Sequence, residues 1–297
     1  MTSHLSVTEK KYKLMDHYCV LGNPVDHSKS PMIHARFAEL TGQSLRYTRQ
    51  RVALDGFTDM LARLRAEGVR GCNVTVPFKF EAYQAAQHQS DRAQLAQAAN
   101  TLRFDDAGIH ADNTDGVGLV NDIQLNAGIN LAGRDILLIG AGGAAAGVLG
   151  PLLASGARRL VVVNRSPEKA AALVARHRQH PWVQGLLQKT ELLMQDIHAP
   201  EGVFDVVINA TASSLTGAAI PVPGSVLKPG ALAYDMMYGP AVEPFAQWAT
   251  SHGALARDGL GMLVEQAAAA FSIWRGVHPP SGQVLREMRT AMSLAAA

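Results

Sequence analysis

One glycine-rich turn constrains the fold of this chain more than any other feature. Four apolar residues, Ile136–Ile139, run directly into Gly140, and Gly142 and the small Ala145 follow at fixed spacing. This matches the G-x-G-x-x-G/A pattern, in which a buried parallel strand turns into a helix and the glycines let a pyrophosphate approach the backbone. The helix N-terminus adds free N–H groups and a positive dipole end. We therefore predict a dinucleotide site here.

The residues after the turn support a strand-helix-strand unit. A second apolar strand is expected at Arg159–Arg165, at the spacing of a βαβ crossover. Gly150 and Pro151 fall inside the intervening helix, where the proline removes a hydrogen bond and is expected to cause a kink.

The end of that second strand indicates which dinucleotide binds. An acidic residue usually stands about 20 residues after the glycines where NAD binds, because it hydrogen-bonds the ribose 2′-hydroxyl. Here the chain has Asn164, Arg165 and Ser166, and Lys169 follows one helical turn later. Two cations suit a 2′-phosphate, so we predict NADP rather than NAD. The alternative is that Arg165 and Lys169 are ordinary solvated charges.

The composition excludes several classes of protein. The chain has 297 residues, of which 47% are hydrophobic and 18% charged, enough for two globular domains. A net charge of +2 with scattered basic residues indicates no nucleic-acid surface, and no apolar run could span a membrane. The two cysteines, Cys19 and Cys72, are expected as buried free thiols in a cytoplasmic protein, and no metal-ligand spacing is present. His177 and His180 are expected at the surface, and residues 1–16 as a disordered polar leader.

Alternating strands and helices predict an α/β fold with a mostly parallel sheet. Before the glycine turn, the expected elements are strands at His17–Leu21, Leu45–Val52 and Arg70–Val76, helices at Ser30–Leu40, Gly56–Glu67, from Phe78 and near Asp91–Ala98, and a hairpin of Asn100–Phe104 with Ile109–Asp112. The later elements are helices at Gly116–Ala127, Val242–Ser251, Leu260–Gly276 and Ser281–Ala296, and strands at Val203–Asn209, Ala231–Met236 and Leu255–Arg257.

Hydroxyl and amide side chains gather near the ends of the early strands. Ser28 and Ser30 precede a predicted helix, where they could bind an anion together with its N–H groups, although Ser30 before Pro31 is also typical of an N-cap. Alternation places Asn73 and Thr75 on one face of their strand.

A lysine and an aspartate are candidates for proton transfer. Pro77 ends a strand, so Lys79 lies at its carboxyl end, where open α/β sheets bind their ligands. A lysine there can exchange a proton with a substrate oxygen if burial lowers its pKa, although a solvated charge is the commoner case. Asp115 alone is typical of an N-cap; a catalytic interpretation requires Lys79 within about 4 Å, so that the carboxylate holds the ammonium.

Seven sequence blocks resemble the shikimate dehydrogenase family. In the family's order they are GNPVDHSKSP, GCNVTVPFK, DNTDGVGL, IGAGGAA, NATASSL, YDMMYG and DGLGMLVEQA, and the match covers nearly everything from residue 17 to 297. The resemblance implies NADPH-dependent reduction of 3-dehydroshikimate to shikimate, on the pathway to aromatic amino acids. Ala35 departs from the family pattern, which usually has asparagine after the histidine.

The resemblance also implies roles for single residues. Lys79 and Asp115 would be the catalytic pair, and Ser28 and Ser30 would hold the substrate carboxylate. The other substrate residues would be Asn73, Thr75, Asn100, Tyr238 and Gln266. The cofactor residues would be Asp91, Gly140, Ala141, Gly142, Gly143, Ala144, Asn164, Arg165, Ser166, Lys169, Met236 and Gly259.

The order of the blocks further implies two domains. Residues 17–116 would begin the substrate-binding domain, 117–253 would form a Rossmann-type NADP domain, and the helices of 254–297 would complete the first domain, because Gln266 must rejoin Ser28 and Lys79. A cleft that closes on a small-molecule substrate is expected, and a homodimer is a candidate assembly. The alternatives are a broader quinate/shikimate dehydrogenase, often NAD-linked, and a non-catalytic dinucleotide sensor, which would be expected to lose Lys79 or Asp115.

Overall fold

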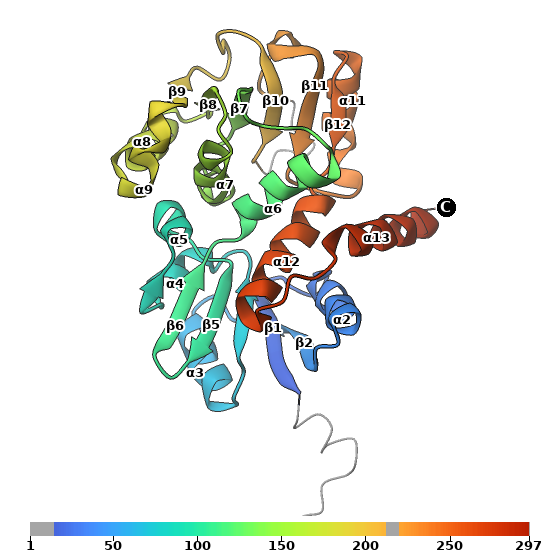
Figure 1. Ribbon diagram of the computed structural model, residues 1–297. Helices are drawn as coiled ribbons and strands as arrows, with labels where there is room; N and C mark the ends of the chain where they lie inside the picture. The colour runs from blue at the N-terminus through green and yellow to red at the C-terminus, as the bar shows by residue number, and fades with distance from the viewer. Residues whose placement is uncertain (1–14, 212–219, 297) are drawn as a thin grey trace, which may run out of the picture. The chain divides into compact units, whose positions relative to one another are not determined.

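The chain folds into two compact α/β units. The computed structural model describes residues 15–211 and 220–296, so most of the predicted leader and part of the NATASSL block lie outside the described residues. The first unit comprises the chain up to Thr114 together with Ala267 onwards, and the second comprises Asp115–Gln266 (Figure 1). The predicted fold class is confirmed.

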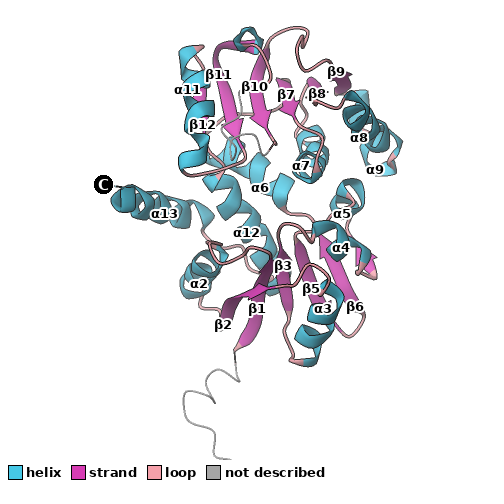
Figure 2. Cartoon of the chain, turned by 180° about the vertical axis from the view of Figure 1, so that it is seen from behind, coloured by secondary structure: helices cyan, strands magenta, loops and turns pink. Residues whose placement is uncertain are grey.

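The first unit contains a six-stranded mixed sheet in the order β2-β1-β3-β5-β6-β4, and Figure 2 labels all of these strands except β4. Its strands are β1 (Asp16–Gly22), β2 (Leu45–Arg51), β3 (Gly71–Val74), β4 (His88–Gln89), β5 (Thr101–Asp105) and β6 (Gly108–Asp112). β1 runs parallel to β2 and β3, whereas β5 is antiparallel to β3 and β6. The helices are α2 (Ser30–Thr41), α3 (Phe57–Ala66), α4 (Lys79–Gln84), α5 (Asp91–Ala96), the later part of α12 (Leu260–Arg275) and α13 (Ser281–Ala296).

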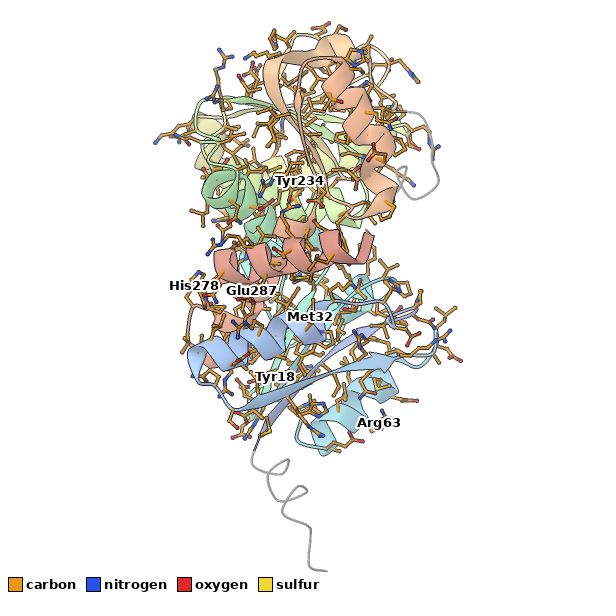
Figure 3. All side chains as sticks on the ribbon, turned by 90° about the vertical axis from the view of Figure 1, so that its right-hand side faces the viewer. Tyr18, Met32, Arg63, Tyr234, His278 and Glu287 are labelled. Atoms are coloured by element: carbon orange, nitrogen blue, oxygen red, sulfur yellow. The ribbon has the colours of Figure 1, made fainter. Side chains whose placement is uncertain are left out.

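Apolar side chains cover both faces of this sheet. On one face, Phe57 of α3 and Phe78, just before α4, pack into a core that contains Cys19 and Cys72, which are buried free thiols as predicted. On the other face, α2 and α12 contribute stacked aromatic rings, and Trp274 donates a hydrogen bond to the Leu102 carbonyl at 3.0 Å. The α13 helix is tied to α2 by Glu287, labelled in Figure 3, which accepts two hydrogen bonds from Arg36.

The second unit contains a fully parallel six-stranded sheet in the order β12-β11-β10-β7-β8-β9. Numbered from β7, this is the strand order 3-2-1-4-5-6 of dinucleotide-binding sheets, with the switch point between β7 and β10. The strands are β7 (Asp135–Ile139), β8 (Arg159–Val163), β9 (Glu191–Gln195), β10 (Phe204–Asn209), β11 (Leu227–Asp235) and β12 (Leu255–Arg257). The helices are α6 (Asp115–Asn121), α7 (Gly143–Ala154), α8 (Pro167–Gln179), α9 (Pro181–Gln184) and α11 (Glu243–Ser251), with a π-turn at Asp122–Asn126 and 3₁₀ turns at Leu186–Gln188, Gly224–Val226 and Pro240–Val242.

Several boundaries differ from the sequence expectations. β8 ends at Val163 rather than Arg165, and β3 ends at Val74, which leaves Thr75 in the following loop. The helix predicted over Gly116–Ala127 changes to a π-turn at Asp122. The strands β4 and β9 were not predicted, because β4 has only two residues and β9 (ELLMQ) lacks a clear alternation of apolar and polar residues. β12 pairs with β11, so the second unit extends past residue 253 to Gln266.

Two local expectations were wrong. Ser30 is not an N-cap: Lys29 occupies that position without a side-chain hydrogen bond, and Ser30 is the first helical residue. His177 is fully buried, because it continues the inward-facing 3.6-residue stripe of Ala170, Leu173 and Val174 on α8. Pro151 lies inside α7, which is a single helix from Gly143 to Ala154, and the kink expected there stays a prediction.

Candidate active site

Asn73 is the centre of a polar cluster in the first unit. It is buried on β3, and the antiparallel register places it opposite Thr101 of β5. Its side-chain amide donates to the Asn100 carbonyl and to Thr101 Oγ1, both at 3.1 Å, and its Oδ1 accepts from the Tyr47 hydroxyl at 2.7 Å. Thr75, two residues later, lies close to Gly22, where a Cβ atom would come within 2.5 Å of the threonine methyl.

Asn100 fixes the loop that leads out of this unit. Its Oδ1 accepts from the backbone N–H of Thr114 at 2.8 Å, and its Nδ2 donates to Thr114 Oγ1 at 3.0 Å. Asn113 beside it is fully buried and donates from Nδ2 to the Ala98 carbonyl at 3.0 Å. A buried amide with this many partners holds its neighbours rigidly. Asp115 follows Thr114 directly, so the backbone on its N-terminal side is held in place.

Lys79 and Asp115 are each the first residue of a helix. Lys79 is the first residue of α4 and is partly buried, and its carbonyl accepts from the backbone N–H of Ala99 at 2.8 Å. Asp115 is the first residue of α6 and is buried. Because Ala99 precedes Asn100 and Asn100 binds Thr114, contacts inside the first unit bring the backbone of Lys79 near the residue that precedes Asp115.

The two predicted carboxylate-binding serines flank the start of α2. Ser28 Oγ accepts from the backbone N–H of Ser30 at 3.3 Å, and Ser30 is buried. The guanidinium of Arg49 donates to the Ser28 carbonyl at 3.0 and 2.6 Å, which places a positive charge beside this loop. Arg49 had no signal in the sequence, because its approach depends on the pairing of β2 with β1.

The glycine turn of the second unit has the shape that a dinucleotide requires. Gly140 has a φ of +117°, a conformation that residues with a Cβ rarely adopt. At Gly142 no described atom lies within 4 Å of the position a Cβ would take, so the backbone at the start of α7 is open to approach. Ala141, Gly143 and Ala144 complete the turn with small side chains. These residues fit a bound NADP pyrophosphate.

The residues predicted to select the cofactor lie next to this turn. Val163 pairs with Ile139, so Asn164 and Gly140 follow neighbouring strand ends. Asn164 Nδ2 donates to the Ser166 carbonyl at 2.9 Å and shapes the loop, and Arg165 and Lys169 are exposed. Because β8 ends at Val163, two residues earlier than expected, Arg165 lies in a loop, where its side chain can turn toward a 2′-phosphate.

Met236 and Gly259 are adjacent in the second unit. A Cβ on Gly259 would overlap the Met236 carbonyl, and the Gly259 N–H donates to the Met237 carbonyl at 2.7 Å. Burial raises the pKa of the Tyr238 hydroxyl, which keeps it protonated as a hydrogen-bond donor. Gln266 donates from Nε2 to the Leu263 carbonyl at 2.9 Å. It also packs closely against α6, since a Cβ on Gly118 would lie 2.7 Å from the Cβ of Gln266.

The proposed cofactor residue Asp91 belongs to the first unit. It is exposed at the start of α5, where Ser90 caps the helix by accepting from the Ala93 N–H at 3.2 Å. The other proposed cofactor residues belong to the second unit.

Sequence reasoning missed a buried pair that joins two of the quoted blocks. Asn209 of NATASSL and Asp235 of YDMMYG are buried, and Asn209 Nδ2 donates to Asp235 Oδ2 at 3.0 Å. Asp235 Oδ1 in turn accepts from the Met237 N–H at 2.9 Å, and Asn209 Oδ1 accepts from Thr211. The pair thus shapes the loop that carries Met236 and Tyr238. Polar residues at the ends of two apolar strands were the available signal.

Models of known families match three segments of the chain. Residues 20–102 match a shikimate dehydrogenase substrate binding domain, 123–217 match shikimate / quinate 5-dehydrogenase, and 259–289 match a shikimate 5'-dehydrogenase C-terminal domain. The chain belongs to the shikimate dehydrogenase family. The shikimate dehydrogenase (NADP(+)) of Acidovorax sp. (strain JS42) is 65% identical over 281 residues, which cover 95% of this chain and 98% of that protein.

Solved structures of the shikimate dehydrogenase family share the fold. The shikimate 5-dehydrogenase of Thermus thermophilus, in complex with NADP(H) and shikimate, is 30% identical with a TM-score of 0.78, over 92% of this chain and 99% of that one. An Ael1 enzyme from Pseudomonas putida is 44% identical with a TM-score of 0.83, over 92% of this chain and 97% of that one. The family resemblance predicted from the sequence blocks is therefore confirmed.

The described residues contain neither a cluster of metal ligands nor a membrane-spanning helix. Residues 15–211 and 220–296 contain no group of three or more His, Cys, Asp or Glu side chains that could hold a metal ion. Among the helices of the same residues, none combines the length and apolar character needed to cross a membrane.

Proposed function

We propose that this chain catalyses the reversible, NADPH-dependent reduction of 3-dehydroshikimate to shikimate, a step on the pathway to aromatic amino acids. The observation that carries the proposal is the 65% identity, over 95% of the chain, to a relative named shikimate dehydrogenase (NADP(+)). The chain also keeps Lys79 and Asp115, the two residues that a non-catalytic sensor would be expected to lose.

The polar cluster of the first unit suits a small ring that carries a carboxylate and hydroxyls. We assign the carboxylate to Ser28 and Ser30, beside the charge of Arg49, and the ring hydroxyls to Asn73, Thr75 and Asn100. Tyr238 and Gln266 are assigned to the same substrate. A site that hydrogen-bonds particular hydroxyls rejects analogues that lack them, because its buried polar groups would then lose their partners.

Lys79 and Asp115 are the proposed proton-transfer residues. Bound NADPH supplies the hydride for the ketone carbon. As negative charge develops on the ketone oxygen, the Lys79 ammonium donates a proton to it, and the Asp115 carboxylate orients and stabilises that ammonium. The fixed loop through Asn100 and Thr114 supports this assignment, because it restricts where Asp115 can lie.

We assign the cofactor to the glycine turn and the loop after β8. Gly140, Gly142 and the N-terminus of α7 would hold the pyrophosphate, and Arg165 and Lys169 would pair with the 2′-phosphate. The remaining positions, Asp91, Ser166, Met236 and Gly259, are proposed on family resemblance alone.

A four-way absorbance assay tests this function. Shikimate and quinate are each supplied with NADP and with NAD, and formation of the reduced cofactor is followed. We expect the highest kcat/KM for shikimate with NADP. Comparable rates for quinate with NAD would favour the broader quinate/shikimate dehydrogenase. Binding of NADP with no turnover of either substrate would favour the non-catalytic sensor.

A further inference from the structure

One tyrosine hydroxyl contacts a residue to which a ring hydroxyl of the substrate is assigned. Tyr47 lies on β2, and its hydroxyl donates to Asn73 Oδ1 at 2.7 Å. Burial raises the pKa of this hydroxyl well above its usual value. Tyr47 therefore stays protonated and can donate to Asn73.

The partners of Asn73 restrict what it can offer to a ligand. Both hydrogens of its amide nitrogen are donated within the protein, to the Asn100 carbonyl and to Thr101 Oγ1. The Asn100 carbonyl can only accept, so it fixes which end of the amide is nitrogen. Oδ1 can accept two hydrogen bonds and receives one from Tyr47. Asn73 can therefore accept a hydrogen bond from a substrate hydroxyl, but it has no hydrogen left for a ketone.

The ring of Tyr47 is held in place independently of its hydroxyl. It stacks on His34 with ring centroids 4.3 Å apart and an interplanar angle of 4°. His34 is completely buried, and neither of its ring nitrogens has a hydrogen-bond partner among the described residues. Phe37 and Phe271 pack around the same imidazole. Because packing fixes the ring, a phenylalanine at position 47 would keep the stack and lose only the hydroxyl.

We propose that Tyr47 is a positioning residue for shikimate recognition: its hydroxyl, anchored by the stack on His34, holds Asn73 as an acceptor for a substrate hydroxyl. This inference rests on the proposed function, since it concerns the same substrate. Tyr47 acts on the ring hydroxyls of a cyclic polyol acid through Asn73.

The first experiment compares Tyr47→Phe with Tyr18→Phe. Tyr18, labelled in Figure 3, is a matched control because it is a buried tyrosine of the same aromatic cluster, stacked on Trp274, and its hydroxyl instead accepts from Arg275 at 3.4 Å. In Tyr47→Phe we expect KM for shikimate to rise about tenfold, as for the loss of one buried hydrogen bond, with KM for NADP unchanged. Tyr18→Phe is expected to leave both values unchanged. Equal effects of the two variants on KM for shikimate would overturn the proposal.

A second experiment separates this inference from the proposed function. Calorimetry measures shikimate binding to the cofactor-free wild type, Tyr47→Phe, Asn73→Ala and the double variant. We expect Tyr47→Phe to weaken binding about tenfold in the wild-type background, and to have no further effect once Asn73 is alanine. Additive effects of the two substitutions would show that Tyr47 does not act through Asn73. A wild type that neither binds nor turns over shikimate would instead reject the function itself.

Discussion

Asn73 and Asn100 illustrate, at the scale of single residues, how the predicted substrate pocket is prepared before any ligand binds. Their amides already have several partners from the protein, so neither has to reorganise when a substrate arrives. Because these hydrogen bonds exist before binding, little conformational entropy is lost in ordering the two side chains when a ligand binds. Asn100 holds Thr114, the residue before Asp115, and Ala99, the residue before Asn100, donates to the Lys79 carbonyl.

The role of Lys79 is tested by Lys79→Ala. Removal of the proposed proton donor should lower kcat by about 10²–10⁴-fold, the usual contribution of general acid catalysis. NADP should still bind, because its proposed residues lie elsewhere, and fluorescence titration of NADPH measures this. Near-normal turnover would exclude the proton-transfer role.

Cofactor selection is tested by Arg165→Ala. Loss of one charge-assisted hydrogen bond to a 2′-phosphate should lower kcat/KM for NADP about tenfold and leave the low value for NAD unchanged. Lys189→Ala is the control, since Lys189 is also exposed but precedes β9, at the amino ends of the parallel strands, whereas Arg165 follows the carboxyl end of β8. Steady-state kinetics with both cofactors give the measurement, and an equal loss with NADP and NAD would contradict the assignment.

The buried His34 should make the protein sensitive to acid. Burial lowers the pKa of His34 from 6.5 to about 3, so between these values the unfolded chain binds a proton that the folded chain does not. The stabilisation is complete above pH 6.5 and is lost as the pH falls toward 3. We expect this residue to remove about 2 kcal/mol of unfolding free energy between about pH 7 and pH 5.

His34→Phe provides the comparison for that prediction. The ring is replaced by one of similar size that cannot titrate, so urea unfolding should show a smaller loss of stability on acidification. His177, whose pKa burial lowers to about 4, is present in both proteins and contributes equally to both. Identical pH dependence in wild type and His34→Phe would contradict the account.

At the scale of whole elements, the packing of α6 against its neighbours depends on two glycines. A Cβ on Gly116 would lie 2.5 Å from the Gly147 carbonyl and from Pro151 of α7, and Gly118 meets α12 in a similar way. The π-turn after α6 carries Asp122, which is fully buried and accepts two hydrogen bonds from Arg257 and one from the Tyr234 hydroxyl. The helix that begins at Asp115 is therefore fixed on both sides and at its end.

Gly116→Ala tests the close approach of α6 to α7. The added methyl meets backbone, which cannot yield easily, so we expect a loss of about 2 kcal/mol or more in unfolding free energy. Gly185→Ala is the control: it has helical φ and ψ values, and no described atom lies within 4 Å of its added Cβ. That variant should be neutral or slightly stabilised. Equal stability of the two variants in denaturant unfolding would contradict the packing argument.

At the scale of the whole molecule, the assigned ligands divide between the two units. Most substrate residues lie in the first unit, whereas nearly all cofactor residues lie in the second. Each ligand should stabilise the unit that supplies its contacts. A ligand that binds only the folded form lowers, by mass action, the population of locally opened states in that unit.

Hydrogen exchange followed by mass spectrometry tests this division. NADP should slow exchange at the start of α7 and in the loop after β8, and shikimate should slow exchange in β3 and around Asn100 and Thr114. Protection of β3 by NADP without any change near Gly142 would contradict the assignments.

The sequence by itself determined the fold class, most of the strands and helices, and the dinucleotide turn. These are local properties: an apolar run of four residues, glycines at a fixed spacing and a helical period are visible within one short window. Cys19 and Cys72 could be assigned as buried thiols for the same reason. The cofactor role of Asn164–Ser166 stays a prediction, made from the fixed distance of this segment from the glycines.

Only the tertiary structure decided the contacts between distant segments. Tyr47 reaches Asn73 because β2 and β3 both pair with β1, and Arg257 reaches Asp122 across 135 positions. The need for glycine at position 116 arises from a helix that begins 27 residues later, at Gly143. Such contacts depend on strand register and helix packing, which a sequence window does not contain, and they supply the partners that orient the residues predicted to act on substrate.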